Sequence, residues 1–263
     1  MAAATVVTAQ TDMTSIERAI RHLISERDAE NSKIARLQAL EKIHMTYFAS
    51  EAKRPTKTPA TPQFPHGDRF VDVSADQAHV DLAAVHSHNF GELIVLKATE
   101  GLGYTDGYFV SRWKGAKTEK FVHRGAYHFL HMDESGQAQA EYFLAELDRA
   151  GGVTAQDIVV ADAEISSGQK PSTVAQVVDA FGLTLEQHCP AIRWLYSGGP
   201  FATENGLKLP PYHGHWLPAY VGDPKPYYVF GTPIAWQYNG GGVGPGPDVV
   251  DGIVGPVDLS IIL

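Results

Sequence analysis

The stretch Ile158-Val159-Val160-Ala161-Asp162-Ala163-Glu164 is an apolar run that ends in two carboxylates. A short apolar run of this kind predicts a buried strand. Because side chains at i and i+2 of a strand project from the same face, we expect Asp162 and Glu164 to point the same way. Two like charges at a buried strand end are costly, and such pairs often raise the pKa of one carboxyl group. The stretch is therefore either a catalytic carboxyl pair or a solvated strand end whose carboxylates cap a helix or meet an arginine.

Outward from this strand, strand-like and helix-like stretches alternate from Phe64 onward. The expected strands are Arg69–Val73, Leu93–Ala98, His123–Leu130, Ile158–Ala163, Ile192–Tyr196, Trp216–Val221, Pro233–Tyr238 and Val257–Ile262. The expected helices are Ala78–His88, Gly107–Thr118, Ser135–Ala150 and Ser172–His188. This alternation is typical of an α/β fold with a parallel sheet. Eight strands in so short a segment predict a shortened TIM-like barrel whose last helices are missing or reduced.

Residues 1–53 predict a separate N-terminal α-helical segment. Thr14 to Lys53 contains no Gly or Pro and carries two apolar stripes on either side of the polar sequence DAENSK. A helix this long cannot bury its stripes alone, so we expect self-association, a hairpin near Asp28–Lys33, or packing on the main domain. Residues 54–63 are rich in Pro and Thr and predict a linker, which leaves residues 64–263 as the main domain.

Composition and charge exclude several functional classes. Hydrophobic residues make up 44% of the 263 residues and charged residues 19%, which is ordinary for a soluble globular protein. The net charge of −9 divides into +2 for residues 1–62 and −11 for residues 63–263, and an acidic main domain argues against nucleic-acid binding. The sequence has no membrane-spanning stretch and no recognisable signal peptide. A single cysteine, Cys189, excludes an intramolecular disulfide.

Carboxylates recur where the expected strands end. Asp72 lies at the end of the first strand, Glu100 follows the second, and Asp258 lies near the start of the eighth. Catalytic groups of such barrels lie at the carboxyl ends of the strands. Carboxyl groups surrounded by aromatic rings suit a sugar substrate, since rings stack on pyranose faces. The aromatic residues at these strand ends are Tyr127, Phe129, Trp194, Tyr196, Trp216, Tyr220, Trp236 and Tyr238, of which Trp194 and Phe129 are expected in the barrel core.

Eight motifs, taken in order, resemble those of glycoside hydrolase family 25, the Chalaropsis-type lysozymes. They are Asp72-Val73-Ser74 with Gln77, Lys97-Ala98-Thr99-Glu100-Gly101 with Tyr104 and Asp106, Gly125-Ala126-Tyr127-His128-Phe129 with its following helix, Asp162-Ala163-Glu164, Tyr196-Ser197, Trp216 through Tyr220, Trp236-Gln237-Tyr238 and Val257-Asp258-Leu259. The resemblance covers about residues 66–263. It implies a (β/α)5(β)3 barrel that cleaves the β-1,4 bond between N-acetylmuramic acid and N-acetylglucosamine in bacterial peptidoglycan.

The resemblance also implies roles for individual residues. Glu164 matches the general acid, and Asp162 matches the carboxylate that positions the substrate's acetamido group. The expected supporting carboxylates are Asp72, Asp258 and Glu100, and the expected substrate-binding aromatic residues are Tyr127, Tyr196, Trp216, Tyr220 and Trp236. The sequence leaves open whether the reaction retains or inverts configuration, because carboxyl groups at i and i+2 do not fix their separation. We hypothesise that the substrate's own acetamide assists, with Glu164 as acid and then base.

Two other functions remain open at this point. Twelve histidines, some in the groups HSH (86–88), HFLH (128–131) and HGH (213–215), suggest a metal-dependent wall amidase or deacetylase, but no HExxH motif occurs. We therefore expect no metal and no cofactor. The third possibility is a barrel that binds wall glycan without cutting it. The glycine-rich segment Gly240–Pro247 predicts either a flexible cleft edge or an incidental surface loop.

The sequence also carries an expectation about location. A wall-cutting enzyme without a visible signal peptide or membrane span is expected to be made in the host cytoplasm and to reach the wall after release, as phage lytic enzymes do. The helix in residues 1–53 is then a candidate for virion attachment or self-association.

Overall fold

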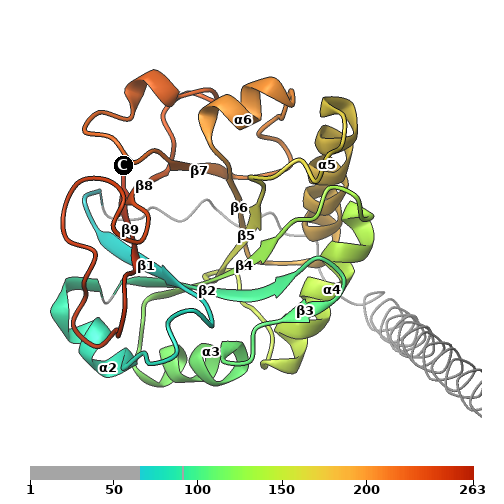
Figure 1. Cartoon of the computed structure of the whole chain (residues 1–263). Helices are drawn as coiled ribbons and strands as arrows, with labels where there is room; N and C mark the ends of the chain where they lie inside the picture. The colour runs from blue at the N-terminus through green and yellow to red at the C-terminus, as the bar shows by residue number, and fades with distance from the viewer. Residues whose placement is uncertain (1–65, 91) are drawn as a thin grey trace, which may run out of the picture. The chain divides into compact units, whose positions relative to one another are not determined.

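The computed structural model describes residues 66–90 and 92–263 (Figure 1). The predicted helix of residues 1–53 and the linker of residues 54–63 lie outside this part of the chain. None of the helices that the structure does describe is long and apolar enough to cross a membrane.

The strands form a closed barrel. Its eight strands are β1 (Arg69–Val73), β2 (Leu93–Glu100), β4 (His123–Phe129), β5 (Ile158–Asp162), β6 (Ile192–Tyr196), β7 (Gly214–Pro218), β8 (Ala235–Asn239) and β9 (Asp258–Ile262). Pairing of β1 with β2 closes the ring, and a short β3 (Tyr104–Thr105) folds back on the end of β2. The strand β9 runs antiparallel to both neighbours, β1 and β8. The first residue of β9 therefore lies at the barrel end where the parallel strands finish.

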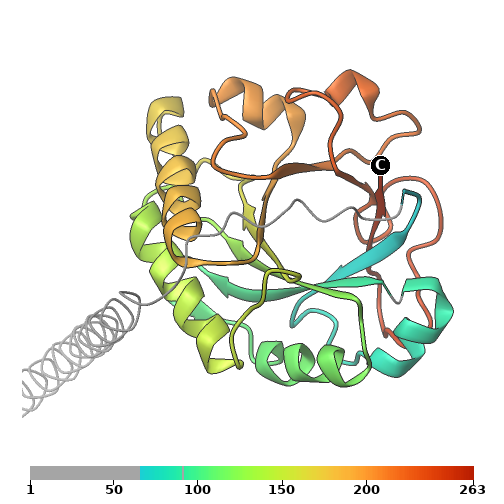
Figure 2. The ribbon, with the colours of Figure 1, turned by 180° about the vertical axis from the view of Figure 1, so that it is seen from behind.

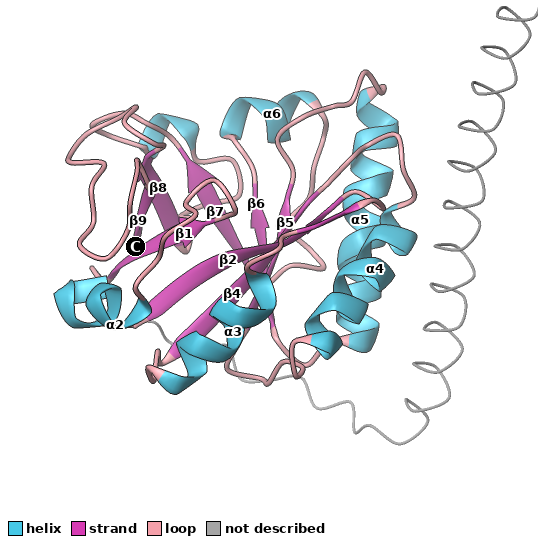
Figure 3. Ribbon diagram, turned by 60° about the horizontal axis from the view of Figure 1, so that its bottom comes forward, coloured by secondary structure: helices cyan, strands magenta, loops and turns pink. Residues whose placement is uncertain are grey.

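The helices lie outside the ring of strands (Figure 1, Figure 2). They are α2 (Leu82–Val85), which continues into the π-helical turn η1 (His86–Phe90), α3 (Phe109–Thr118), α4 (Gly136–Arg149), α5 (Pro171–His188), α6 (Gly199–Glu204) and the 3-10 turn η2 (Lys225–Tyr227). Helices α4 and α5 run side by side (Figure 3). The last three strands, β7, β8 and β9, are joined in the described chain by loops and η2 alone, so the predicted order of five β/α units and three further strands is confirmed.

The boundaries differ from prediction where polar residues hide the pattern. The helix expected at Ala78–His88 starts later because the Asp81 side chain accepts hydrogen bonds from the backbone N–H groups of Ala83 and Ala84 and caps α2. Strand β7 begins at Gly214 rather than at Trp216, and the polar side chain of His215 concealed this start. Helix α6 was not predicted, because it is short and begins with Gly-Pro.

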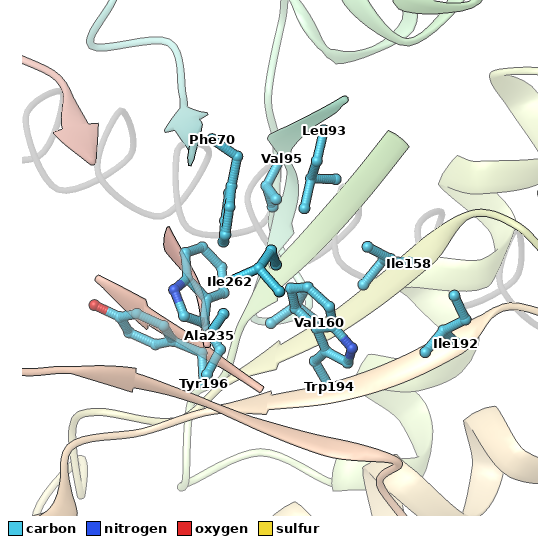
Figure 4. Packing of buried hydrophobic residues seen from close by; sticks show 11 residues of the cluster. Phe70, Leu93, Val95, Ile158, Val160, Ile192, Trp194, Tyr196, Ala235 and Ile262 are labelled. Carbon is cyan, nitrogen blue, oxygen red and sulfur yellow. The ribbon is translucent and has the colours of Figure 1, made fainter. Parts of the chain in front are cut away.

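Alternate residues of the strands fill the interior of the barrel (Figure 4). This core contains Phe70, Leu93, Val95, Ile158, Val160, Ile192, Trp194, Tyr196, Trp216, Ala235 and Ile262. The ring of Phe70 lies 5.3 Å from that of Trp216, which in turn lies 4.8 Å from Tyr196. Burial of each large side chain contributes about 1.5–3 kcal/mol. The core is continuous with the cleft described next, because Val160, Tyr196 and Trp216 belong to both.

Candidate active site

An open cleft lies at the carboxyl ends of the parallel strands. It encloses about 550 Å³ of empty space, part of it open to solvent. Its lining residues are Asp72, Ser74, Asp76, Lys97, Tyr127, Phe129, Val160, Asp162, Glu164, Tyr196, Trp216 and Asp258. Four predicted carboxylates, Asp72, Asp162, Glu164 and Asp258, are thus brought together from β1, β5 and its following loop, and β9. The cleft thus combines carboxyl groups and aromatic rings in one open site.

The end of β5 places Asp162 and Glu164 on one face. Val160, Asp162 and Glu164 all line the cleft, whereas Ala161 and Ala163 are buried on the opposite side. Backbone hydrogen bonds hold this strand end between its neighbours, from Leu130 N–H to the Asp162 carbonyl (2.9 Å) and from Ala163 N–H to the Tyr196 carbonyl (2.9 Å). The prediction that the two carboxyl groups share a face is confirmed.

Asp162 lies in surroundings that oppose its charge. Its side chain is only 7% exposed, and its Oδ1 is buried without a hydrogen-bond partner in the described part of the chain. Burial raises the pKa of Asp162 well above its ordinary value, and the nearby charges of Glu164 and Asp72 raise it further. Lys97 acts in the opposite direction and favours the ionised form.

Glu164 has a different environment, because its side chain remains exposed to solvent in the cleft. The surrounding protein nevertheless removes part of its hydration, which raises the pKa of Glu164, and the charge of Asp258 adds to this shift. Lys97 again opposes the shift. A carboxyl group with a raised pKa that a substrate can reach is the requirement for a general acid near neutral pH.

Asp72 and Asp258 form a second carboxyl pair. They are register partners in the β1–β9 pair and hydrogen-bond to each other. Burial and the charge of Asp258 raise the pKa of Asp72 well above its ordinary value. Burial also raises the pKa of Asp258, although the hydrogen bond with Asp72 and the nearby Gly241 backbone reduce that effect. Two carboxyl groups this close are expected to hold one proton between them.

Gln237 connects this pair to two tyrosines, and sequence reasoning assigned it no role. Its Nε2 donates to Asp72 Oδ1 (3.0 Å), while its Oε1 accepts from the hydroxyl groups of Tyr196 (2.7 Å) and Tyr220 (2.8 Å). The side chain of Gln237 is buried, so its amide group is held in place by three partners. The only sequence signal for Gln237 was its place in the motif Trp236-Gln237-Tyr238.

The predicted aromatic residues occupy three kinds of position. Tyr127, Tyr196 and Trp216 line the cleft, as predicted. Tyr220 is not among the lining residues, but its hydroxyl group belongs to the Gln237 network and burial raises its pKa to about 12. Trp236 also lies outside the lining, where its Nε1 donates to the Ala219 carbonyl (2.7 Å).

The two aromatic residues expected in the core differ from each other. Trp194 is fully buried, as predicted. Phe129, in contrast, lies in the cleft lining at the end of β4, so its expected place in the core is wrong. Phe129 of β4 is the register partner of Asp162 of β5 and therefore lies at the same level of the barrel as this cleft carboxylate.

Lys97 is the positively charged residue of the cleft lining, and Glu100 forms an ion pair with it. Glu100 is not among the lining residues, and instead its two oxygens bind Lys97 Nζ (2.6 Å) and His131 Nε2 (3.0 Å). Partial burial would raise the pKa of Glu100, but hydrogen bonds from Lys97 and His131 outweigh it and lower the pKa. Lys97 Nζ also lies 5.2 Å from the Phe129 ring centroid. The sequence signal for a functional role of Lys97 was its place as a charged residue inside the apolar run that forms β2.

The histidine groups do not form a metal centre in the part of the chain that the structure describes, where no three His, Cys, Asp or Glu side chains are arranged to hold an ion. His128 is fully buried, and burial lowers its pKa to about 3. Its ring nitrogens bind Thr99 Oγ1 (2.7 Å) and Gln139 Oε1 (3.1 Å). His128 therefore joins β2, β4 and α4 as a neutral structural group.

Comparison with known proteins identifies the family. Residues 71–247 match the model of glycosyl hydrolases family 25. The chain belongs to this family. The match includes Asp72, Asp162 and Glu164 and ends before Asp258, which the barrel nevertheless brings into the same cleft.

Individual relatives agree with this assignment. The chain is 42% identical over 74 residues to an N,O-diacetylmuramidase of Arthroderma benhamiae, and 42% identical over 77 residues to one of a Chalaropsis species. Each alignment covers 28% of this chain. The matched part spans about a third of each relative, 31% of the first and 36% of the second. The bacterial lysozyme of Streptomyces coelicolor superposes with a TM-score of 0.64 at 25% identity, covering 76% of this chain and 93% of that one.

Proposed function

We propose that this protein is an N-acetylmuramidase, which hydrolyses the β-1,4 bond between N-acetylmuramic acid and N-acetylglucosamine in bacterial peptidoglycan. The observation that carries the proposal is the pair Asp162 and Glu164 in an aromatic-lined cleft of a family 25 barrel. The two carboxyl groups differ in exposure, since Asp162 is buried and Glu164 is open to solvent. Two titratable groups in different environments can take different roles in one reaction.

Glu164 is the proton donor in this proposal. Protein surroundings and Asp258 favour its protonated form, and its exposure lets it reach the glycosidic oxygen of a bound glycan. After bond cleavage the same carboxylate accepts a proton from the attacking water, as microscopic reversibility requires.

Asp162 orients the substrate's acetamido group. Its buried Oδ1 has no hydrogen-bond partner among the described residues, and a carboxylate oxygen accepts a hydrogen bond from the N–H of an acetamido group. Held in this way, the acetamide oxygen attacks the anomeric carbon and a protein nucleophile is not required, which is a recognised route for glycosidases. This role needs the ionised form of Asp162, which Lys97 favours against the burial and the neighbouring carboxylates that raise its pKa.

Digestion of purified peptidoglycan tests the reaction. The products are reduced with borohydride and analysed by mass spectrometry. New reducing ends on muramic acid are expected. Reducing ends on glucosamine, or freed amino groups, would contradict the proposal. Isolation of a covalent sugar adduct on Asp162 would contradict acetamide assistance while leaving the muramidase activity intact.

We also propose that residues 1–53 provide self-association or virion attachment, on the basis of their two predicted apolar stripes. Sedimentation of the whole chain beside residues 64–263 tests the first role, and equal monomeric masses would contradict it. We further propose that the enzyme is made in the host cytoplasm and acts on the wall after release. Expression in a bacterium should then cause lysis only when the membrane is permeabilised.

A further inference from the structure

The glycine-rich segment between β8 and β9 is a folded part of the barrel rim. Asn239 at the end of β8 is only 1% exposed, and its Oδ1 accepts a hydrogen bond from the Gly242 N–H (2.9 Å). Its Nδ2 donates to the carbonyl groups of Pro245 (3.4 Å) and Gly246 (3.3 Å). Gly240 and Val243 exchange two backbone hydrogen bonds (2.8 and 3.2 Å). The segment therefore wraps around one buried side chain.

Two of its glycines make room for the side chain of Tyr220. A Cβ atom at Gly240 would overlap the Tyr220 ring and would lie 2.7 Å from its hydroxyl oxygen. A Cβ at Gly244 would lie 3.1 Å from the Tyr220 Cβ and would overlap the Tyr238 carbonyl oxygen, at a backbone φ of +117° that only glycine adopts readily. The Tyr220 ring therefore occupies space that a side chain at either glycine would take.

The segment is connected to both members of the Asp72–Asp258 pair. Through Tyr220 it reaches Gln237 Oε1, and Gln237 Nε2 donates to Asp72. On the other side the Gly241 backbone lies beside Asp258, since a Cβ atom at Gly241 would be 3.6 Å from Asp258 Oδ1. The loop thus lies next to Asp258 itself and reaches Asp72 through Tyr220 and Gln237.

We infer that Asn239–Pro247 is a positioning element of the active site, which sets the Asp72–Asp258 pair through the Gly240–Tyr220–Gln237 contacts and through the Gly241 backbone beside Asp258. This role differs from the flexible cleft edge and the incidental surface loop between which the sequence did not decide. The inference rests on the proposed muramidase function only for its kinetic consequence. Because Asp258 acts on Glu164, displacement of the pair is expected to alter the acid group of the reaction.

Gly240→Ala tests the inference, with Gly222→Ala as the matched control. A Cβ at Gly222 would have no neighbour within 4 Å, and Gly222 lies two residues from Tyr220. Gly240→Ala should lower kcat/KM on peptidoglycan about 10- to 100-fold, the cost of a small misplacement at an active site. The loss should appear in kcat and shift the pH profile, whereas Gly222→Ala should match the wild type in both.

A double-mutant cycle identifies the route. In a Tyr220→Ala background, Gly240→Ala should cause less than about a twofold further loss, since the ring it displaces is gone. Full additivity of the two losses would overturn the Tyr220 route. Tyr220→Phe keeps the ring of this partly exposed residue and removes only the hydroxyl group. It should lower kcat severalfold, and unchanged kcat and pH profile would likewise count against the inference.

A readout without catalysis separates this inference from the proposed function. The side-chain carboxyl carbons of Asp72 and Asp258 are observed by 13C NMR in labelled protein and assigned with Asp72→Asn and Asp258→Asn. Both signals should move and titrate differently in Gly240→Ala but not in Gly222→Ala. If the signals stay unchanged in a folded Gly240→Ala protein, the inference is wrong. If the wild type releases no muramic acid ends, the proposed function is wrong and the NMR result still decides the inference.

Discussion

Asp72 and Asp258 face each other as register partners across the antiparallel β1–β9 pair, and their carboxyl groups are hydrogen-bonded. The arrangement depends on the reversed direction of β9, which brings its first residue to the barrel end where β1 finishes. Gln237 Nε2 donates to Asp72 Oδ1, so we expect a proton shared by the pair to be held on the other oxygen of Asp72. This geometry makes a neutral Asp72 the form that best fits the folded protein.

Asp72→Asn should therefore stabilise the protein at neutral pH. The pKa of Asp72 is raised in the folded state, so its contribution to stability is fully present below the unfolded pKa and is lost as pH rises through the folded pKa. Asparagine reproduces the protonated form, with one acceptor for Gln237 and one donor for Asp258. We expect a gain of about 0.5–2 kcal/mol at pH 7, in the range of single stabilising substitutions, and none in strong acid.

Denaturant unfolding of the Asn variant and the wild type at several pH values measures this difference. The neutral His128 changes stability with pH in both proteins and cancels in the comparison. Asp133→Asn, at an exposed position, serves as the control and should show little change. An Asp72→Asn protein that loses stability at pH 7 would mean that Asp72 is charged in the folded state.

Glu164→Gln should abolish most of the activity while leaving the fold intact. Loss of a general acid typically costs about 10²–10⁴-fold in rate, and the exposed side chain of Glu164 contributes little to packing. Turbidity clearing of cell walls and the thermal midpoint measure the two effects, with the exposed Glu204→Gln as control. Clearing at the wild-type rate would mean that Glu164 is not the acid. Complete loss of activity with full binding to the wall would separate catalysis from glycan binding.

Treatment with a chelator should leave the activity unchanged. The cleft lining contains carboxylates but no histidine, and no three metal-ligating side chains in the described chain are arranged to hold an ion. Activity is measured on purified peptidoglycan after incubation with EDTA and removal of the chelator. Inactivation that added zinc restores would favour the metal-dependent amidase or deacetylase over the muramidase.

Features that depend on local pattern could be predicted from the sequence, and features that depend on strand contacts could not. The run Ile158–Glu164 showed its strand and its shared carboxyl face because apolar burial and the i, i+2 alternation are local properties. Gln237 approaches Asp72 across 165 residues of chain, and only barrel closure brings the two together. Glu100 was predicted as a site carboxylate from its motif, yet its oxygens bind Lys97 and His131, two contacts that no local pattern shows.

The Lys97–Glu100 ion pair predicts two opposite shifts of the pH profile. Lys97 lowers the pKa of Asp162, whereas Glu100 raises it. Lys97→Met should therefore raise the pKa of Asp162, and the acidic limb of the kcat/KM profile, which reports its ionisation, should move to higher pH. Glu100→Gln removes a negative charge and leaves Lys97 without its ion-pair partner, so the same limb should move to lower pH. Profiles of both variants on peptidoglycan fragments measure the shifts, and movement in the same direction would show that the pair acts through structure rather than through charge.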